Sequence, residues 1–138
     1  MTRREIRESL YIMLFRLDFH EGEDLKEQAE MYIEDLEHAT GKIKKELREK
    51  FEGVIEHLEE IDSKIEEKAK GWTVNRIAKA ELTILRLAVF ELLYVDDVPN
   101  RVAINEAVEL AKAYGGDKGP GFINGVLASI VRELPEDK

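Results

Sequence analysis

Residues 77–93 read IAKAELTILRLAVFELL, and this stretch decides the fold. Its apolar side chains fall on most sides of a helix instead of on one stripe, as expected of a helix that is packed all round. We therefore predict a central helix here that forms the hub of the core. The chain has 138 residues, of which 43% are hydrophobic, so one domain with a sizeable core is expected around that helix.

Helical signals also dominate the rest of the chain. Thr2 and Glu5 have the spacing of a capping box ahead of an apolar stripe that continues to Leu17. Similar stripes predict helices over residues 25–36, 43–61, 102–114 and about 122–131, with a short helix capped by Ser63 and closed by Gly71. Strand signals are nearly absent. The sequence therefore predicts an all-α bundle of six to seven helices.

Composition excludes several classes of protein. Cysteine is absent, which excludes a disulfide framework, a thiolate zinc site and a cysteine nucleophile. The first residues lack the apolar region of a signal peptide, and no stretch approaches the roughly 20 apolar residues that span a bilayer. We therefore expect a soluble, cytoplasmic protein with no membrane partner.

The charge of the chain is strongly acidic and unevenly distributed. A net charge of −9 repels phosphates at long range and argues against indiscriminate nucleic-acid binding. Residues 1–20 sum to +1, residues 21–70 to −8 and residues 71–138 to −2. Any nucleic-acid site is therefore expected to be small and local, with the N-terminus as the best candidate.

No residue pattern indicates catalysis. The histidines, His20, His38 and His57, lie in separate predicted elements and lack the spacing of metal ligands. Glu106 and Glu109 can share a helix face, but the Glu-x-x-His pairs of carboxylate metal sites are missing, so solvated helix charges fit better. We therefore expect no enzymatic activity, no metal site and no cofactor.

Three arginines lie in the first two turns of the first predicted helix. Arg3, Arg4 and Arg7 can project from the same side of that helix. Cations at a helix N-terminus oppose the helix dipole, which makes a pure stability role less attractive. The spacing fits two interpretations equally well, a solvated surface paired with Glu8 or a phosphate-binding site.

A glycine-rich segment, residues 115–121, precedes Phe122. Its simplest interpretation is a flexible connector between two helices, since it lacks the G-K-[ST] of a phosphate-binding P-loop. Four glycines and Lys118 nevertheless leave room for a nucleic-acid backbone or base to approach, with an aromatic face available for stacking. Spacing alone favours the connector, and the phosphate- or base-binding interpretation stays open beside it.

The second half of the chain carries more specific motifs. In order, they are Trp72–Ala78, Ile84–Leu92, Val98–Pro99, Val102–Lys112 and Phe122–Leu127. These motifs closely resemble the NusB family of bacterial transcription antitermination factors in order and spacing. The N-terminal arginines, followed by Leu14 and Phe15, resemble the start of that family, while residues 20–70 match only in length and helical character.

This resemblance implies a fold of two packed helical subdomains, about residues 1–61 and 62–138, within a single domain over residues 1–138. It also implies that the protein pairs with the ribosomal protein NusE, and that the pair binds the single-stranded boxA element of nascent RNA. By the same resemblance, the pair is expected to help the elongating RNA polymerase read through terminators in ribosomal RNA operons. Because the chain is acidic, we expect weak RNA affinity for the chain alone and a partner that supplies part of the surface.

The family's functional residues transfer to matching positions of this sequence. The resemblance implies RNA contacts from Arg3, Arg4, Arg7, Lys118 and Phe122, with Phe15 as a further candidate. It implies a NusE contact from Arg76 and Glu81.

Two other functional classes fit the sequence. The chain could be an RNA-binding accessory domain related to RNA methyltransferases, although no glycine-rich cofactor motif follows a strand. It could also be a structural helical protein whose apolar face forms a homodimer.

Overall fold

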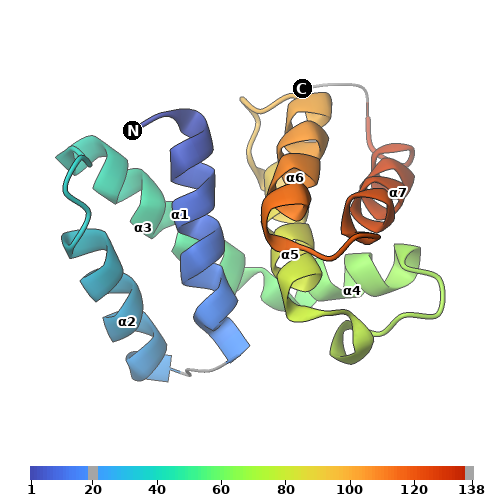
Figure 1. The fold of residues 1–138 in the computed structure, drawn as a ribbon, viewed down its shortest axis with the longest axis horizontal. Helices are drawn as coiled ribbons and strands as arrows, with labels where there is room; N and C mark the ends of the chain where they lie inside the picture. The colour runs from blue at the N-terminus through green and yellow to red at the C-terminus, as the bar shows by residue number, and fades with distance from the viewer. Residues whose placement is uncertain (19–21, 136–138) are drawn as a thin grey trace. The chain divides into compact units, whose positions relative to one another are not determined.

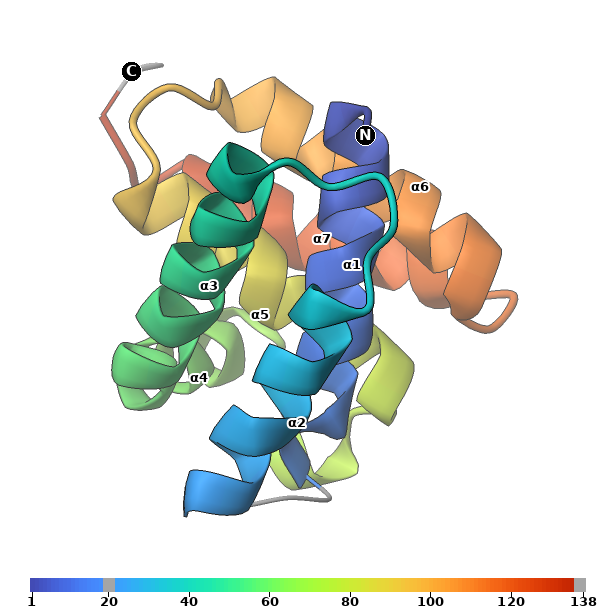
Figure 2. The same cartoon turned by 90° about the vertical axis from the view of Figure 1, so that its left-hand side faces the viewer.

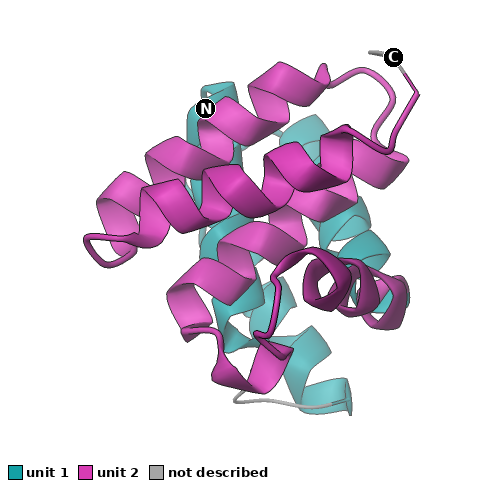
Figure 3. Cartoon of the chain, turned by 90° about the vertical axis from the view of Figure 1, so that its right-hand side faces the viewer, with its two compact units in different colours: residues 1–56 teal, residues 57–138 magenta. Residues whose placement is uncertain are grey.

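Seven α-helices and two short 3-10 helices make up the computed structural model, which describes residues 1–18 and 22–135 (Figure 1). No strand occurs in these ranges, so the predicted all-α class and helix number are confirmed. Within the same ranges, no helix combines the length and apolar character needed to cross a bilayer. The chain divides into two units, Met1–Glu56 and His57–Lys138, each of which has its own packing (Figure 3).

Unit 1 contains α1 (Arg3–Phe15), the 3-10 helix η1 (Arg16–Asp18), α2 (Gly22–Glu34) and α3 (Gly41–Glu56) (Figure 2). The predicted capping box begins α1. The Thr2 hydroxyl accepts the Glu5 N–H at 3.1 Å, and the Glu5 carboxylate accepts the Thr2 N–H at 2.7 Å. These bonds satisfy backbone donors that a helix start leaves without partners, and they lower the pKa of Glu5.

The core of unit 1 follows the predicted apolar stripes. Helix α3 packs against both α1 and α2. The buried apolar side chains recur at helical spacing: Ile6, Leu10, Met13 and Leu14 on α1, Leu25, Ala29 and Ile33 on α2, and Leu47, Phe51 and Val54 on α3. Burial of these stripes is the main source of stability for helices of this length, because isolated short helices are marginal in water.

Unit 2 is built around one buried helix. Its elements are α4 (Leu58–Lys68), the 3-10 helix η2 (Val74–Arg76), α5 (Lys79–Tyr94), α6 (Asn100–Tyr114) and α7 (Gly119–Val131). Helix α5 packs against α4, α6 and α7, and all its residues from Glu81 to Leu92 are buried. The predicted central helix is therefore confirmed as the hub of this unit.

Burial on all sides requires that the charged side chains of α5 find partners inside the protein. The buried Arg86 guanidinium donates two hydrogen bonds to the Asp62 carboxylate of α4, at 2.8 and 2.9 Å. This bidentate geometry is the strongest form of an arginine–carboxylate pair. It ties α4 to the central helix.

The predicted helix over residues 43–61 is wrong at its C-terminal end, because the helix is interrupted at His57, between the end of α3 and the start of α4. The His57 ring stacks on Tyr94 of α5, with ring centroids 4.0 Å apart. The Tyr94 hydroxyl donates to the Glu60 carboxylate, and burial together with this bond raises the pKa of Tyr94 to about 12. A contact with a distant helix thus interrupts a stripe that is continuous in the sequence.

Two helix starts also differ from the predictions. Ser63 lies inside α4 and does not cap a new helix, and the Glu66 carboxylate instead accepts the Val74 N–H at 2.7 Å. The last helix begins at Gly119 instead of Phe122, so the connector after α6 is shorter than expected. Pro120 fits the first turn because the N–H that proline lacks has no helical partner there.

Replacing Asp62 by Ala is expected to lower the free energy of unfolding by about 3 kcal/mol, because it leaves the Arg86 guanidinium buried without its carboxylate. Urea unfolding followed by circular dichroism measures the change. Glu109→Ala is the control, since Glu109 pairs with Lys112 on the exposed surface at 3.0 Å and such pairs contribute less than about 1 kcal/mol. Equal losses for the two variants would contradict a special role of the buried pair.

Candidate nucleic-acid and partner interface

Arg3 of α1 lies in a bidentate ion pair with Glu46 of α3. Its Nη1 donates to Glu46 Oε1 at 2.9 Å and its Nη2 to Oε2, while 58% of the Arg3 side chain stays exposed. Hydrogen bonding to Arg3, reinforced by Lys50 at 3.0 Å, lowers the pKa of Glu46 to about 2. Because this pKa lies below the ordinary 4.5, the pair stabilises unit 1 above that pH and the contribution is lost as pH falls towards 2.

The other N-terminal candidates are placed unequally. Arg4 is exposed, whereas only 9% of Arg7 is accessible. Phe15 is half-buried, with its ring centroid 5.9 Å from that of Tyr11. The part of this cluster that a phosphate can reach in the present conformation is therefore Arg3 and Arg4.

In unit 2, the carboxylate of Glu81 organises the glycine-rich segment. Its Oε1 accepts the Gly116 N–H at 2.9 Å, and only 9% of Glu81 is exposed. A Cβ at Gly115 would lie 2.9 Å from this oxygen, and one at Gly119 would lie 2.8 Å from it. The segment thus comes so close to Glu81 that side chains at these two positions would collide with the carboxylate. The connector is held at a fixed point on α5 instead of being loose.

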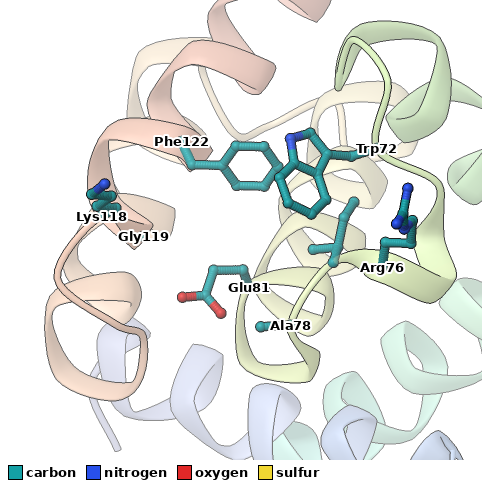
Figure 4. Close-up of a pocket in the computed structure, with 8 residues that line it drawn as sticks. Trp72, Arg76, Ala78, Glu81, Lys118, Gly119 and Phe122 are labelled. Atoms are coloured by element: carbon teal, nitrogen blue, oxygen red, sulfur yellow. The ribbon is translucent and has the colours of Figure 1, made fainter.

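All four candidates of unit 2 line one pocket of about 390 Å³ (Figure 4). Arg76, Glu81, Lys118 and Phe122 come from η2, α5, the connector and α7 respectively. Trp72 joins them, with half of its surface exposed and its ring directed towards Phe122. The sequence motif contains Trp72, but sequence reasoning did not assign it to the site; a lone tryptophan in a polar stretch was the available signal.

The pocket combines an apolar interior with charges at its edge. Arg76 and Lys118 are exposed, and neither has an ion-pair partner among residues 1–18 and 22–135. Each therefore keeps its full charge available for a ligand. Aromatic faces flanked by cations suit a nucleotide base with its phosphate, and they also suit an apolar side chain of a protein partner.

The two described histidines lie in different units, His38 in unit 1 and His57 in unit 2. His38 is exposed and His57 lies against Tyr94, whereas His20 falls outside the described residues. Among the residues that the structure describes, no three His, Asp or Glu side chains are grouped as metal ligands.

Comparison with known proteins identifies the family. A sequence profile described as the NusB family matches residues 4–132. The chain belongs to the NusB family. The transcription antitermination protein NusB of Lachnoclostridium phytofermentans is 49% identical over 131 residues, which cover 95% of this chain and 99% of that protein.

Solved structures of NusB proteins show the same fold. T. maritima NusB superimposes with a TM-score of 0.89 at 34% identity, covering 100% of this chain and 94% of that one. A chain from a crystal structure of the antitermination factors NusB and NusE in complex with dsRNA gives a TM-score of 0.83 at 27% identity, covering 96% and 97%. Family membership confirms the predicted class, a transcription antitermination factor of a non-enzymatic family.

Gly115→Ala is expected to lower the free energy of unfolding by about 1–3 kcal/mol, because its Cβ would meet the Ala111 backbone oxygen and Glu81, each at 2.9 Å. Thermal unfolding measures this change. Gly125→Ala on α7 is the matched control, since its Cβ meets nothing within 4 Å and alanine is favoured in helices by about 1 kcal/mol. A harmless Gly115→Ala would show that the connector does not depend on close approach to Glu81.

Proposed function

We propose that this chain, acting in the cytoplasm, pairs with the ribosomal protein NusE and binds the single-stranded boxA element of nascent RNA. The pair then promotes read-through of terminators in ribosomal RNA operons by the elongating RNA polymerase. The observation that carries the proposal is the convergence of Arg76, Glu81, Lys118 and Phe122 on one pocket. The relative that was crystallised with NusE and dsRNA supports both kinds of partner.

We assign RNA contacts to each unit separately. In unit 1, Arg3 and Arg4 contact phosphates and the half-buried Phe15 is a further candidate, whereas the buried Arg7 reaches RNA only if α1 rearranges. In unit 2, Phe122 stacks on a base and Lys118 contacts a phosphate. Base stacking on aromatic side chains and cationic contacts to the backbone are the usual means of binding single strands.

The ion pair between Arg3 and Glu46 competes with RNA. An exposed pair of this kind contributes at most about 1 kcal/mol, so a phosphate can replace the Glu46 carboxylate. The pKa of Glu46, about 2, keeps the carboxylate charged at neutral pH, so the competition persists under physiological conditions.

Glu46→Gln is therefore expected to tighten boxA binding by up to about fivefold, because it releases Arg3 for a phosphate. Electrophoretic shifts with boxA RNA and a scrambled RNA, with and without NusE, measure the effect. Glu49→Gln on the same helix is the control, since it also removes one negative charge, but the ion-pair partner of Glu49 is Lys45 and not Arg3. If both variants tightened RNA binding equally, the effect would come from net charge and not from release of Arg3. Equal affinity of the unmodified chain for the two RNAs would contradict boxA recognition itself.

We assign the NusE contact to the pocket edge at Arg76 and Glu81. Arg76 is exposed and has no ion-pair partner among the described residues, so it is available to an acidic group of the partner. The buried Glu81 contributes indirectly, because its Oε1 accepts the Gly116 N–H and so positions the connector that forms part of the partner-binding surface. A change at Glu81 therefore alters the connector and the contact together, whereas a change at Arg76 probes the contact alone.

Arg76→Glu is expected to weaken NusE pairing about tenfold or more, because it reverses the charge at the pocket edge. Isothermal titration calorimetry measures the affinity, and circular dichroism checks that the fold is kept. Arg101→Glu is the matched control, since Arg101 of α6 is also exposed and without an ion pair among the described residues but lies outside the pocket. Unchanged pairing in Arg76→Glu would remove Arg76 from the contact.

A further inference from the structure

A second pocket, of about 360 Å³, lies between the end of α4 and the outer face of α7. We call it the α4–α7 groove; the residues that matter for its chemistry are Lys70, Trp72, Gly121, Phe122, Gly125 and Arg132. Trp72 and Phe122 line this groove and the first pocket alike, so the two hollows adjoin at the same pair of aromatic rings. The groove holds none of the other residues assigned to RNA or NusE above.

A constrained turn places one wall of the groove. Lys70 has φ +36 and Gly71 has φ +90, so two successive residues adopt the left-handed region, which is unfavourable for lysine. The turn is held by the Trp72 N–H, which donates to the Ala69 carbonyl at 3.3 Å, and by the Val74 N–H, which donates to Glu66. This strained turn carries an indole that leaves half of its surface exposed.

The opposite wall is flat. Gly121 and Gly125 are exposed on α7, and a Cβ at either position would have nothing within 4 Å. No side chain from these positions therefore fills the space beside the aromatic rings, and a planar group can approach the helix backbone closely.

The distribution of cations identifies the kind of ligand. Among the described residues of unit 2, the exposed cations without an ion-pair partner are Lys70, Arg76, Arg101, Lys118 and Arg132. All of these except Arg101 line one of the two pockets. In a chain of net charge −9, this concentration of available positive charge around two aromatic rings indicates an anionic ligand with planar groups.

We propose that the α4–α7 groove is an additional RNA subsite, in which a base stacks on Trp72 while Lys70 and Arg132 contact the flanking phosphates. It binds nucleotides that lie beyond the element bound at Phe122 and Lys118. The proposal rests on the RNA-binding function proposed above and extends it to a longer strand. Single-strand sites combine a cationic track with stacking in this way.

The test compares a boxA RNA with versions extended by four uridines at the 5′ or the 3′ end. One extension is expected to tighten binding by about fivefold or more. It should also steepen the slope of log K against log salt by about 1.4, the value for two further phosphates on a single strand. Trp72 is the only tryptophan of the chain and lines both pockets, so the signal for the groove is the quenching of its fluorescence that the extended RNA adds to the quenching by the boxA core.

The double variant Lys70→Gln/Arg132→Gln should bind the boxA core normally and lose the gain from the extension. Arg101→Gln/Lys112→Gln removes the same charge from α6 and should keep the gain. No gain with either extension, or a gain that survives the first double variant, would overturn the groove proposal while core binding stays intact. A double variant that weakens NusE pairing instead would also overturn it. Failure of the unmodified chain to bind the core would count against the proposed function.

Discussion

Burial of α5 on all sides, from Glu81 to Leu92, is the constraint on which unit 2 depends. A helix without an exposed face must pair its polar side chains inside the protein, and each pairing fixes another element. The Arg86 guanidinium donates to the Asp62 carboxylate and so connects α5 to α4. The Thr83 hydroxyl donates to the Lys79 carbonyl of the same helix at 2.7 Å. The Glu81 carboxylate accepts a hydrogen bond from the Gly116 N–H and so positions the connector that leads into α7. The site is thus a consequence of how the core satisfies its own polar groups.

This constraint also explains the chemistry of the pocket. Because the connector lies against Glu81, α7 begins at Gly119 and directs Phe122 towards Trp72. The turn after α4 presents Trp72 from the other side. Two aromatic rings therefore line the same pocket, one from a helix and one from a hydrogen-bonded turn. A site that is held in place before a ligand arrives loses little conformational entropy on binding.

The sequence predicts local features of this fold well and distant contacts poorly. The capping box of Thr2 and the all-round apolar pattern of α5 are encoded within a few residues, and both are confirmed. The helix break at His57 occurs where its ring stacks on Tyr94, which lies 37 residues later in the chain. The apolar periodicity of residues 43–61 gives no sign of this contact. Likewise, Arg3 pairs with Glu46, and Glu81 accepts from the Gly116 N–H, although the partners are more than 30 residues apart in the sequence. Spacing offered Glu8 as one possible partner of the arginines and gave no sign of Glu46, because a sequence shows only which residues are close along the chain.

The two units use their cations differently, and this bears on how an acidic chain binds RNA. In unit 1, acidic side chains form ion pairs with Arg3, Arg48 and Lys50, so the acidic residues of this unit partly neutralise its cations. In unit 2, Lys68 of the α4–α7 groove pairs with Glu133, whereas the other cations at the pockets, Lys70, Arg76, Lys118 and Arg132, have no ion pair among the described residues. Salt screens charges beyond about 8 Å at physiological ionic strength, so a bound phosphate responds to the cations beside it more than to the distant acidic helices. On the proposed function, net charge therefore limits the approach of RNA, whereas the cations without ion pairs among the described residues favour the pockets of unit 2 as the place of contact.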